Sequence, residues 1–242
     1  MLLIDMRLAI DRLLKYERQG STVSPSDFNR FVRQAAREEF VAIKQAAEVN
    51  NDVTHSLLPF IKEVTLTHTY GIVNLPNDYS KVLSVSLIHN GMYVSVDEVS
   101  AMEYDQFMGN SVLRATHKHP VYRLIGSKLV LNPIPVGSTV NMTYISKYEE
   151  PYLDYYINKQ YKVVYLTEGE VVNAASQMDP NFINYGDNGK PIPLVGGMYT
   201  SKTNELEFDD ASSIRIFHKV LTYCGLTVPD EKILANEEGE NS

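Results

Sequence analysis

The 242-residue sequence contains a single cysteine, Cys224, which excludes an intrachain disulfide and favours assembly inside a cell. No window approaches the roughly 18 uninterrupted apolar residues that a membrane-spanning helix needs. The first five residues lack the basic region and the long apolar core of a secretory signal. We therefore expect a soluble protein that is neither secreted nor held in a membrane.

An excess of positive charge is also missing, because the formal net charge is −8. Residues 1–50 contain 8 Lys and Arg against 7 Asp and Glu, residues 51–150 contain 7 against 9, and residues 151–242 contain 7 against 14. Without a basic stripe, the protein is not expected to have a surface that grips nucleic acid. The acidic excess of the last third would instead repel phosphates.

The sequence lacks the common catalytic templates. It has no phosphate-binding Gly-x-x-x-x-Gly-Lys-Ser/Thr, no Gly-x-Ser-x-Gly, no His-Glu-x-x-His and no Cys-x-x-Cys. His117 and His119 would point to one face of a strand and could form part of a metal site, although a solvent-exposed loop explains them as well. Asp209 and Asp210 could bind a cation, but acids at the start of a helix need no such role. We expect no enzyme activity, no cofactor and no bound metal.

Both ends of the chain have helical periodicity. The apolar residues of 3–19 and of 25–49 recur at three- and four-residue steps, and Ser24, Pro25 and Asp27 form a helix-start signal. A short third helix is expected within 53–61. Ser212 or Ser213 is expected to cap a final helix that extends through Cys224 and ends at Gly225.

The middle of the chain has the two-residue period of β-strands. Asn90-Gly91 predicts a tight hairpin, and Ser100 with Glu103 predicts a capped helix that ends near Gly109. The expected strands cover residues 64–66, 72–73, 82–88, 93–96, 121–124, 129–132 and 139–146. Short strands with tight turns favour a small sandwich or barrel.

Between the β region and the last helix the pattern is weaker. Residues 161–166 and 170–173 are expected to pair as a hairpin around Glu168-Gly169, and residues 176–203, rich in proline and glycine, are expected to form an extended arm. The tyrosines that precede the arm suit a subunit interface or a carbohydrate-stacking surface. The interface candidates are Tyr152, Tyr155, Tyr156 and Tyr161.

The order of several short motifs resembles the head-to-tail adaptor proteins of short-tailed phages, of the tail tubular protein A type and including crAss-like phages. The matching segments are Leu75-Pro-Asn-Asp-Tyr79, Pro120-Val-Tyr122, Leu131-Asn-Pro-Ile-Pro135, Val140–Tyr144, Glu205-Leu-Glu-Phe208 and Leu221–Asp230. They extend over nearly the whole chain, and only the region 176–203 is longer and richer in turn residues than the family pattern.

This resemblance implies an α+β fold in which N- and C-terminal helices form a helical core with an inserted β domain. The expected parts are N-terminal helices at 1–62, the β domain at 63–150, a hairpin and arm at 151–211, and a C-terminal helix and tail at 212–242. It further implies a virion subunit, assembled in the host cytoplasm, that forms a ring, usually a dodecamer in this family, between the portal protein and downstream tail proteins. The portal-docking candidates are Pro229, Ile233 and Leu234, and DNA would pass through the ring without specific binding. A carbohydrate- or receptor-binding module of a phage tail is the alternative function.

Overall fold

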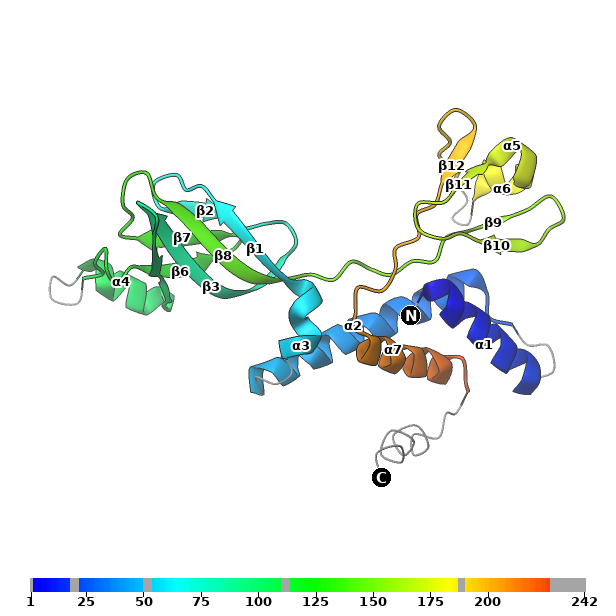
Figure 1. The fold of residues 1–242 in the computed structure, drawn as a ribbon, viewed down its shortest axis with the longest axis horizontal. Coiled ribbons are helices and arrows are strands. Elements are labelled where there is room, and N and C mark those ends of the chain that lie inside the picture. Colours follow the sequence, from blue (N-terminus) through cyan, green and yellow to red (C-terminus); the bar gives the residue numbers. More distant parts are fainter. Residues whose placement is uncertain (1, 18–21, 50–53, 110–113, 187–189, 227–242) are drawn as a thin grey trace, which may run out of the picture. The chain divides into compact units, whose positions relative to one another are not determined.

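The computed structural model describes residues 2–17, 22–49, 54–109, 114–186 and 190–226. The chain divides into two compact units (Figure 1). The helical unit combines Met1–Ser56 with Glu149–Ser242, and the β unit is Leu57–Tyr148. Helices near both ends of the chain and a sheet-rich middle confirm the α+β fold class. Within the described ranges, no helix is long and apolar enough to cross a membrane.

The long helices of the helical unit form where the sequence predicts them. They are α1 (Leu3–Glu17), α2 (Pro25–Val49) and α7 (Asp210–Tyr223), while the short α3 (Thr54–Leu57) follows α2. At the start of α2 the Asp27 N–H donates to Ser24 Oγ at 3.0 Å, which confirms Ser24 as the cap. The predicted last residues of the first helix, 18 and 19, lie outside the described ranges.

Helices α2 and α7 pack against each other through their apolar stripes. A buried ion cluster accompanies this packing, because the Glu39 side chain of α2 is only 4% exposed. Its two carboxylate oxygens accept from Arg215 Nε at 2.6 Å and from Lys219 Nζ at 2.9 Å, both on α7. The two cations compensate the buried negative charge and join the two ends of the chain.

The cap of α7 differs from the prediction. Asp209, not Ser212 or Ser213, is the N-cap, and its Oδ1 accepts from the Ser212 N–H at 2.7 Å. The two serines lie inside the helix and are buried, so neither can occupy the flanking position. The expected end is confirmed, since Gly225 has a φ of +75° and the Leu226 N–H donates to the Leu221 carbonyl at 3.0 Å.

Two small antiparallel sheets complete the helical unit. Strand β9 (Tyr155–Ile157) pairs with β10 (Val163–Tyr165), and β11 (Val171–Asn173) pairs with β12 (Met198–Thr200). The predicted hairpin between 161–166 and 170–173 is therefore wrong, because each of these segments pairs with a partner that the local pattern does not indicate. The expected arm at 176–203 also contains regular structure, namely the end of α5 (Ala174–Gln177), α6 (Pro180–Tyr185) and β12.

Two buried polar side chains connect the helices to these strands. The Arg7 guanidinium of α1 lies 5.3 Å from the ring centre of Phe28 on α2 and 5.4 Å from that of Tyr165 on β10. The Asn29 side chain of α2 donates to the Leu153 carbonyl at 3.0 Å and accepts from the Leu153 N–H at 2.9 Å. The chain that enters β9 is thereby held against α2.

The β unit is a sandwich, one of the two architectures that the sequence allows. It begins with a 3-10 turn, Leu58–Phe60, and its bounds differ by a few residues from the expected 63–150. One sheet has the order β1-β8-β3-β4 and the other the order β2-β7-β6-β5, with only the β5–β6 pair parallel among the described strands. The strands are β1 (Ile61–Leu66), β2 (Ile72–Asn74), β3 (Tyr79–His89), β4 (Met92–Ser95), β5 (Asp97–Glu98), β6 (Val121–Ile125), β7 (Lys128–Asn132) and β8 (Thr139–Ser146).

Local signals explain much of this unit. Asn90 and Gly91 both have positive φ, +51° and +75°, as the predicted hairpin between β3 and β4 requires. Helix α4 (Ala101–Gly109) begins with the predicted capping box, in which the Ser100 N–H donates to Glu103 Oε2 at 2.8 Å and the Glu103 N–H to Ser100 Oγ at 3.2 Å. Alternate residues from both sheets form one core, which includes Val85, Leu129 and Met142.

Candidate functional site

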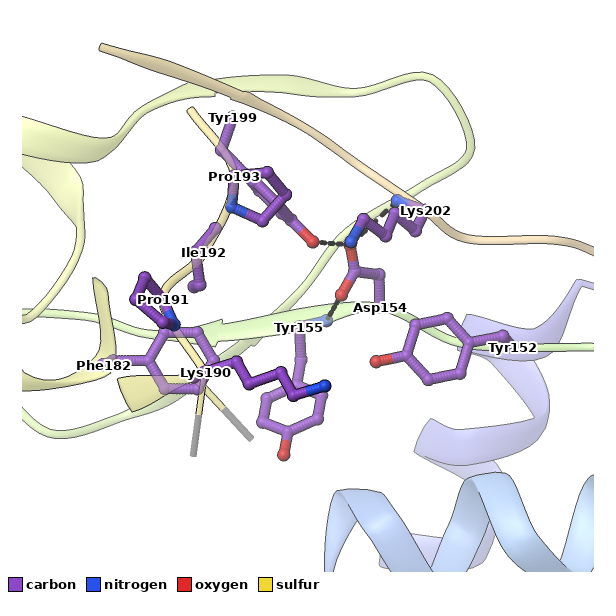
Figure 2. Close-up of a pocket in the computed structure, with 11 residues that line it drawn as sticks. Tyr152, Asp154, Tyr155, Phe182, Lys190, Pro191, Ile192, Pro193, Tyr199 and Lys202 are labelled. Carbon is purple, nitrogen blue, oxygen red and sulfur yellow. Dashed lines mark hydrogen bonds between the residues drawn. The ribbon is translucent and has the colours of Figure 1, made fainter. Parts of the chain in front are cut away.

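A buried carboxylate lies at the centre of the strand region of the helical unit. Asp154 is 3% exposed and immediately precedes β9. Its Oδ2 accepts from the Tyr199 Oη–H at 2.5 Å and from the Lys202 N–H at 2.8 Å, and its Oδ1 accepts from the Tyr155 N–H at 2.9 Å (Figure 2). Three donors therefore stabilise the negative charge, and the side chain joins the start of β9 to the chain around β12.

A second set of hydrogen bonds supports this carboxylate. The Asp154 N–H donates to Thr203 Oγ1 at 3.0 Å, and the Thr203 hydroxyl donates to the Leu166 carbonyl at 2.6 Å. Thr203 is itself 5% exposed. Each of these hydrogen bonds joins one segment of the chain to another. The network around Asp154 therefore holds these segments together.

A small pocket opens beside Asp154. Its cavity volume is about 250 Å³. The lining combines aromatic, aliphatic and lysine side chains, namely Tyr152, Asp154, Tyr155, Phe182, Lys190, Pro191, Ile192, Pro193, Tyr199 and Lys202 together with Gly186. Sites for drug-sized ligands measure roughly 300–1,000 Å³, so this pocket suits a single side chain or one sugar ring.

The polar groups of the pocket include a phenol donor and a hydrogen-bonded carboxylate. Burial, followed by the hydrogen bond to Asp154 and the charge of that carboxylate, raises the pKa of the Tyr199 phenol. Tyr199 therefore keeps its proton at neutral pH and acts as a donor. Asp154 accepts three protein hydrogen bonds, which occupy most of the roughly four acceptor positions of a carboxylate.

The structure separates the four tyrosines that the sequence groups together. Tyr152 and Tyr155 both line the pocket, and the ring of Tyr155 lies 5.8 Å from that of Phe182. Tyr155 and Tyr156 are 7% and 6% exposed and belong to the core of their own chain. Tyr161 is 77% exposed in the turn between β9 and β10.

The other sequence-based candidates do not join this site. His117 and His119 lie exposed in a turn closed by pairing of Thr116 with His119, so the strand that the metal hypothesis requires is absent there. Asp209 lies at the start of α7, as the helix-start interpretation predicts, and it takes the N-cap position that the sequence assigned to Ser212 or Ser213. The portal-docking candidates Pro229, Ile233 and Leu234 lie outside the described residues.

Sequence reasoning missed most of the pocket. Asp154, Phe182, Tyr199 and Lys202 are distributed over some fifty positions and share no motif spacing. Only Asp154 carried a usable signal, because a carboxylate placed between Leu153 and Tyr155 in an apolar segment needs compensating donors if it is buried.

A second hollow lies in the β unit. Its volume is about 630 Å³, and it is formed by the loop from β1 to β2 and the loop from β7 to β8. Two of its residues are apolar and almost fully exposed, Tyr70 at 98% and Val136 at 95%. Exposed apolar groups around a hollow are typical of contact surfaces for other proteins.

Within the described ranges, no group of three or more His, Cys, Asp or Glu side chains could hold a metal ion. Among the residues that the structure describes, the pocket beside Asp154 and the hollow between the β1–β2 and β7–β8 loops are two candidate recognition surfaces. The chain matches no protein-family model, and no curated protein matches it either.

Proposed function

We propose that this chain is a structural subunit of a virion, the head-to-tail connector that links the portal protein to the tail of a short-tailed phage. The observation that carries this proposal is the packing of α2 against α7, from opposite ends of the chain, while the β sandwich between them in sequence forms its own unit. The motif resemblance implies this arrangement. The three protein donors on the buried Asp154 also favour a structural role for this carboxylate.

In this proposal the chain works by assembly. Side-to-side contacts between copies close a ring, a dodecamer by resemblance, and the segment with Pro229, Ile233 and Leu234 docks on the portal. The β unit, through the hollow at Tyr70 and Val136, contacts a downstream tail protein. Carboxylates from the acidic last third would line the channel and let DNA pass without being held.

The test uses the protein in its particle. We expect mass spectrometry of purified virions to detect the chain in about the copy number of the portal, and the purified chain to co-sediment with portal rings. A chain truncated after Thr227 should keep its helical circular dichroism and lose portal binding, whereas Val171→Ala, at an exposed position on β11, should bind normally. Absence of the chain from purified particles, or measurable turnover by the free protein, would refute the proposal.

The pocket supports one alternative, a carbohydrate- or receptor-binding module of a phage tail. Tyr152 offers aromatic surface beside the polar groups of the pocket, which is the combination that a sugar ring requires. A glycan array would detect such binding. Loss of the signal in Tyr152→Ala, with retention in Tyr161→Ala, whose ring lies outside the pocket, would favour this alternative.

A further inference from the structure

Tyr70 occupies a turn position that tyrosine does not favour. It forms a two-residue turn with Gly71, in which the Thr69 N–H donates to the Ile72 carbonyl at 2.9 Å and the Ile72 N–H to the Thr69 carbonyl at 3.0 Å. The φ angles of Tyr70 and Gly71 are +51° and +82°. A bulky side chain at positive φ is an outlier, because its Cβ crowds the backbone. The Tyr70 side chain is also 98% exposed, so contacts within the β unit offset little of this strain.

The β unit contains a second turn of similar backbone geometry. The hairpin between β3 and β4 has a φ of +51° at Asn90 and of +75° at Gly91. Asparagine followed by glycine is the ordinary sequence of such a turn. With tyrosine in place of the asparagine, the turn at Tyr70 loses stability and exposes a large aromatic ring to water. Strain that is kept at an exposed position indicates a role outside the fold of the chain itself.

Tyr70 lines the hollow of the β unit. The volume of this hollow, about 630 Å³, lies within the roughly 300–1,000 Å³ of ligand sites. Hydrogen bonds fix the loops around it, since the Leu131 N–H donates to the Gly71 carbonyl at 2.9 Å and Ser138 Oγ is bonded to His68 Nε2 at 3.4 Å. The hollow is therefore formed before any ligand arrives.

Charged side chains are missing from the lining. Among the described residues that form the hollow, none is Asp, Glu, Lys or Arg, although charged residues make up 21% of the chain. A phosphate, a nucleic acid or an anionic lipid would require cationic side chains there. The hollow is therefore suited to an uncharged ligand.

Several polar groups of the lining have no protein partner. Among the residues that the structure describes, Thr69 Oγ1, Tyr70 Oη and Asn132 Oδ1 take part in no hydrogen bond. His68 Nδ1 is buried and is likewise without a partner in the described ranges. An apolar side chain of a protein would leave these groups unpaired, which costs binding free energy. Sugar hydroxyls both donate and accept hydrogen bonds, and the apolar face of a sugar ring packs on an aromatic ring.

We propose that this hollow binds a neutral saccharide. The ring of Tyr70 is the stacking platform, and Thr69 and Asn132 form hydrogen bonds with the sugar hydroxyls. The inference goes beyond the connector function, which gives the same hollow to a downstream tail protein, so the saccharide and the tail protein would exclude each other there. The site is also distinct from the pocket beside Asp154.

A glycan array that carries neutral and acidic oligosaccharides tests the site with the full chain. We expect binding to neutral glycans that is the same at low and at high salt, because no charged side chain takes part. Tyr70→Ala should weaken this binding at least about tenfold, whereas Tyr70→Trp should keep it. Tyr161→Ala is the matched control and should bind normally, because Tyr161 is also an exposed turn tyrosine at positive φ but lies outside the hollow.

Unfolding in urea, followed by tyrosine fluorescence, gives an independent measurement. Tyr70→Asn gives the turn the Asn-Gly sequence of the β3–β4 turn. It should therefore raise the urea midpoint of the β unit while it abolishes glycan binding. A lower midpoint would show that the tyrosine stabilises the turn, and would remove the argument from strain.

The inference would be overturned by an array on which no neutral glycan binds, by binding confined to acidic glycans, or by equal losses in Tyr70→Ala and Tyr161→Ala. Binding that is lost in Tyr152→Ala but kept in Tyr70→Ala would move the site to the pocket beside Asp154. Absence of glycan binding, together with failed tail assembly in virions that carry Tyr70→Ala, would assign the hollow to a tail protein and leave the connector function standing.

Discussion

The pairing of Asn29 with Leu153 makes the connection between α2 and β9 directly testable. Asn29 is 3% exposed and Leu153 is 1% exposed, so neither backbone group of Leu153 can turn to water instead. The carbonyl accepts from Asn29 Nδ2 at 3.0 Å, and the N–H donates to Asn29 Oδ1 at 2.9 Å. Substitution by alanine removes both partners at once.

The expected cost follows from these two groups. A buried donor or acceptor without a partner costs about 1–3 kcal/mol, so two of them cost about 2–6 kcal/mol together. Alanine recovers about 0.6 kcal/mol through its higher helix propensity. We therefore expect Asn29→Ala to lower the free energy of unfolding of the helical unit by about 1.5–5 kcal/mol.

Urea unfolding followed by circular dichroism at 222 nm measures this loss of unfolding free energy, because α1, α2 and α7 all lie in the helical unit. Gln45→Ala is the matched control, since Gln45 is also an amide on α2 but is exposed. It should change the free energy by less than about 0.5 kcal/mol. A loss below about 1 kcal/mol for Asn29→Ala, or an equal loss for Gln45→Ala, would refute the reasoning.

Three further variants test other parts of the fold by urea unfolding, followed at 222 nm for the helical unit and by tyrosine fluorescence for the β unit. Gly71→Ala should lower the free energy of unfolding by about 3 kcal/mol, because its φ is +82° and the new Cβ would lie 2.7 Å from a backbone oxygen. Gly137→Ala has a φ of +78° but open space around the new Cβ, so it should lower that free energy by only about 1 kcal/mol. Equal losses for the two variants would contradict the steric clash at Gly71. Asp209→Asn should remove part of the dependence of the free energy of unfolding on acid pH. Burial acts to raise the pKa of Asp209, but the hydrogen bonds from Ser212 outweigh it and lower that pKa. The stabilisation is therefore complete above the unfolded pKa near 3.8 and is lost as the pH falls through the folded pKa. An unchanged pH profile would contradict this. Glu39→Ala should lower the free energy of unfolding by about 2 kcal/mol, because it leaves two partly buried cations without their carboxylate. An unchanged free energy would show that the ion cluster does not contribute to stability.

Short-range signals predicted most of the β unit and the long helices. The Asn90-Gly91 hairpin and the capping box of Ser100 and Glu103 depend on backbone angles and hydrogen bonds within four residues. Residue types at that short spacing are enough to predict both. The apolar stripes of α2 and α7 likewise predict a helix without any knowledge of which surface each stripe packs against. The residues that determine each of these elements therefore lie close together in the chain.

The prediction failed where pairing depends on distant segments. Val171–Asn173 could pair locally with 161–166, yet it pairs with Met198–Thr200, because Asp154 accepts from both Tyr199 and the Lys202 N–H and thereby brings that chain to β9. The N-cap at Asp209 was missed for a related reason, since Ser212 and Ser213 are equally good caps in isolation and only packing shows that both are buried.

The sequence by itself determined the local elements: the helices at both ends, the strands of the middle and the turns between them, because their causes lie within a few residues of one another. Only the tertiary structure decided which tyrosines surround a pocket, that Asp154 is buried with three donors, and that Tyr70 lies exposed in a strained turn. Burial and partnership are properties of the packed chain, since each depends on residues that lie far away in the sequence and arrive only on folding.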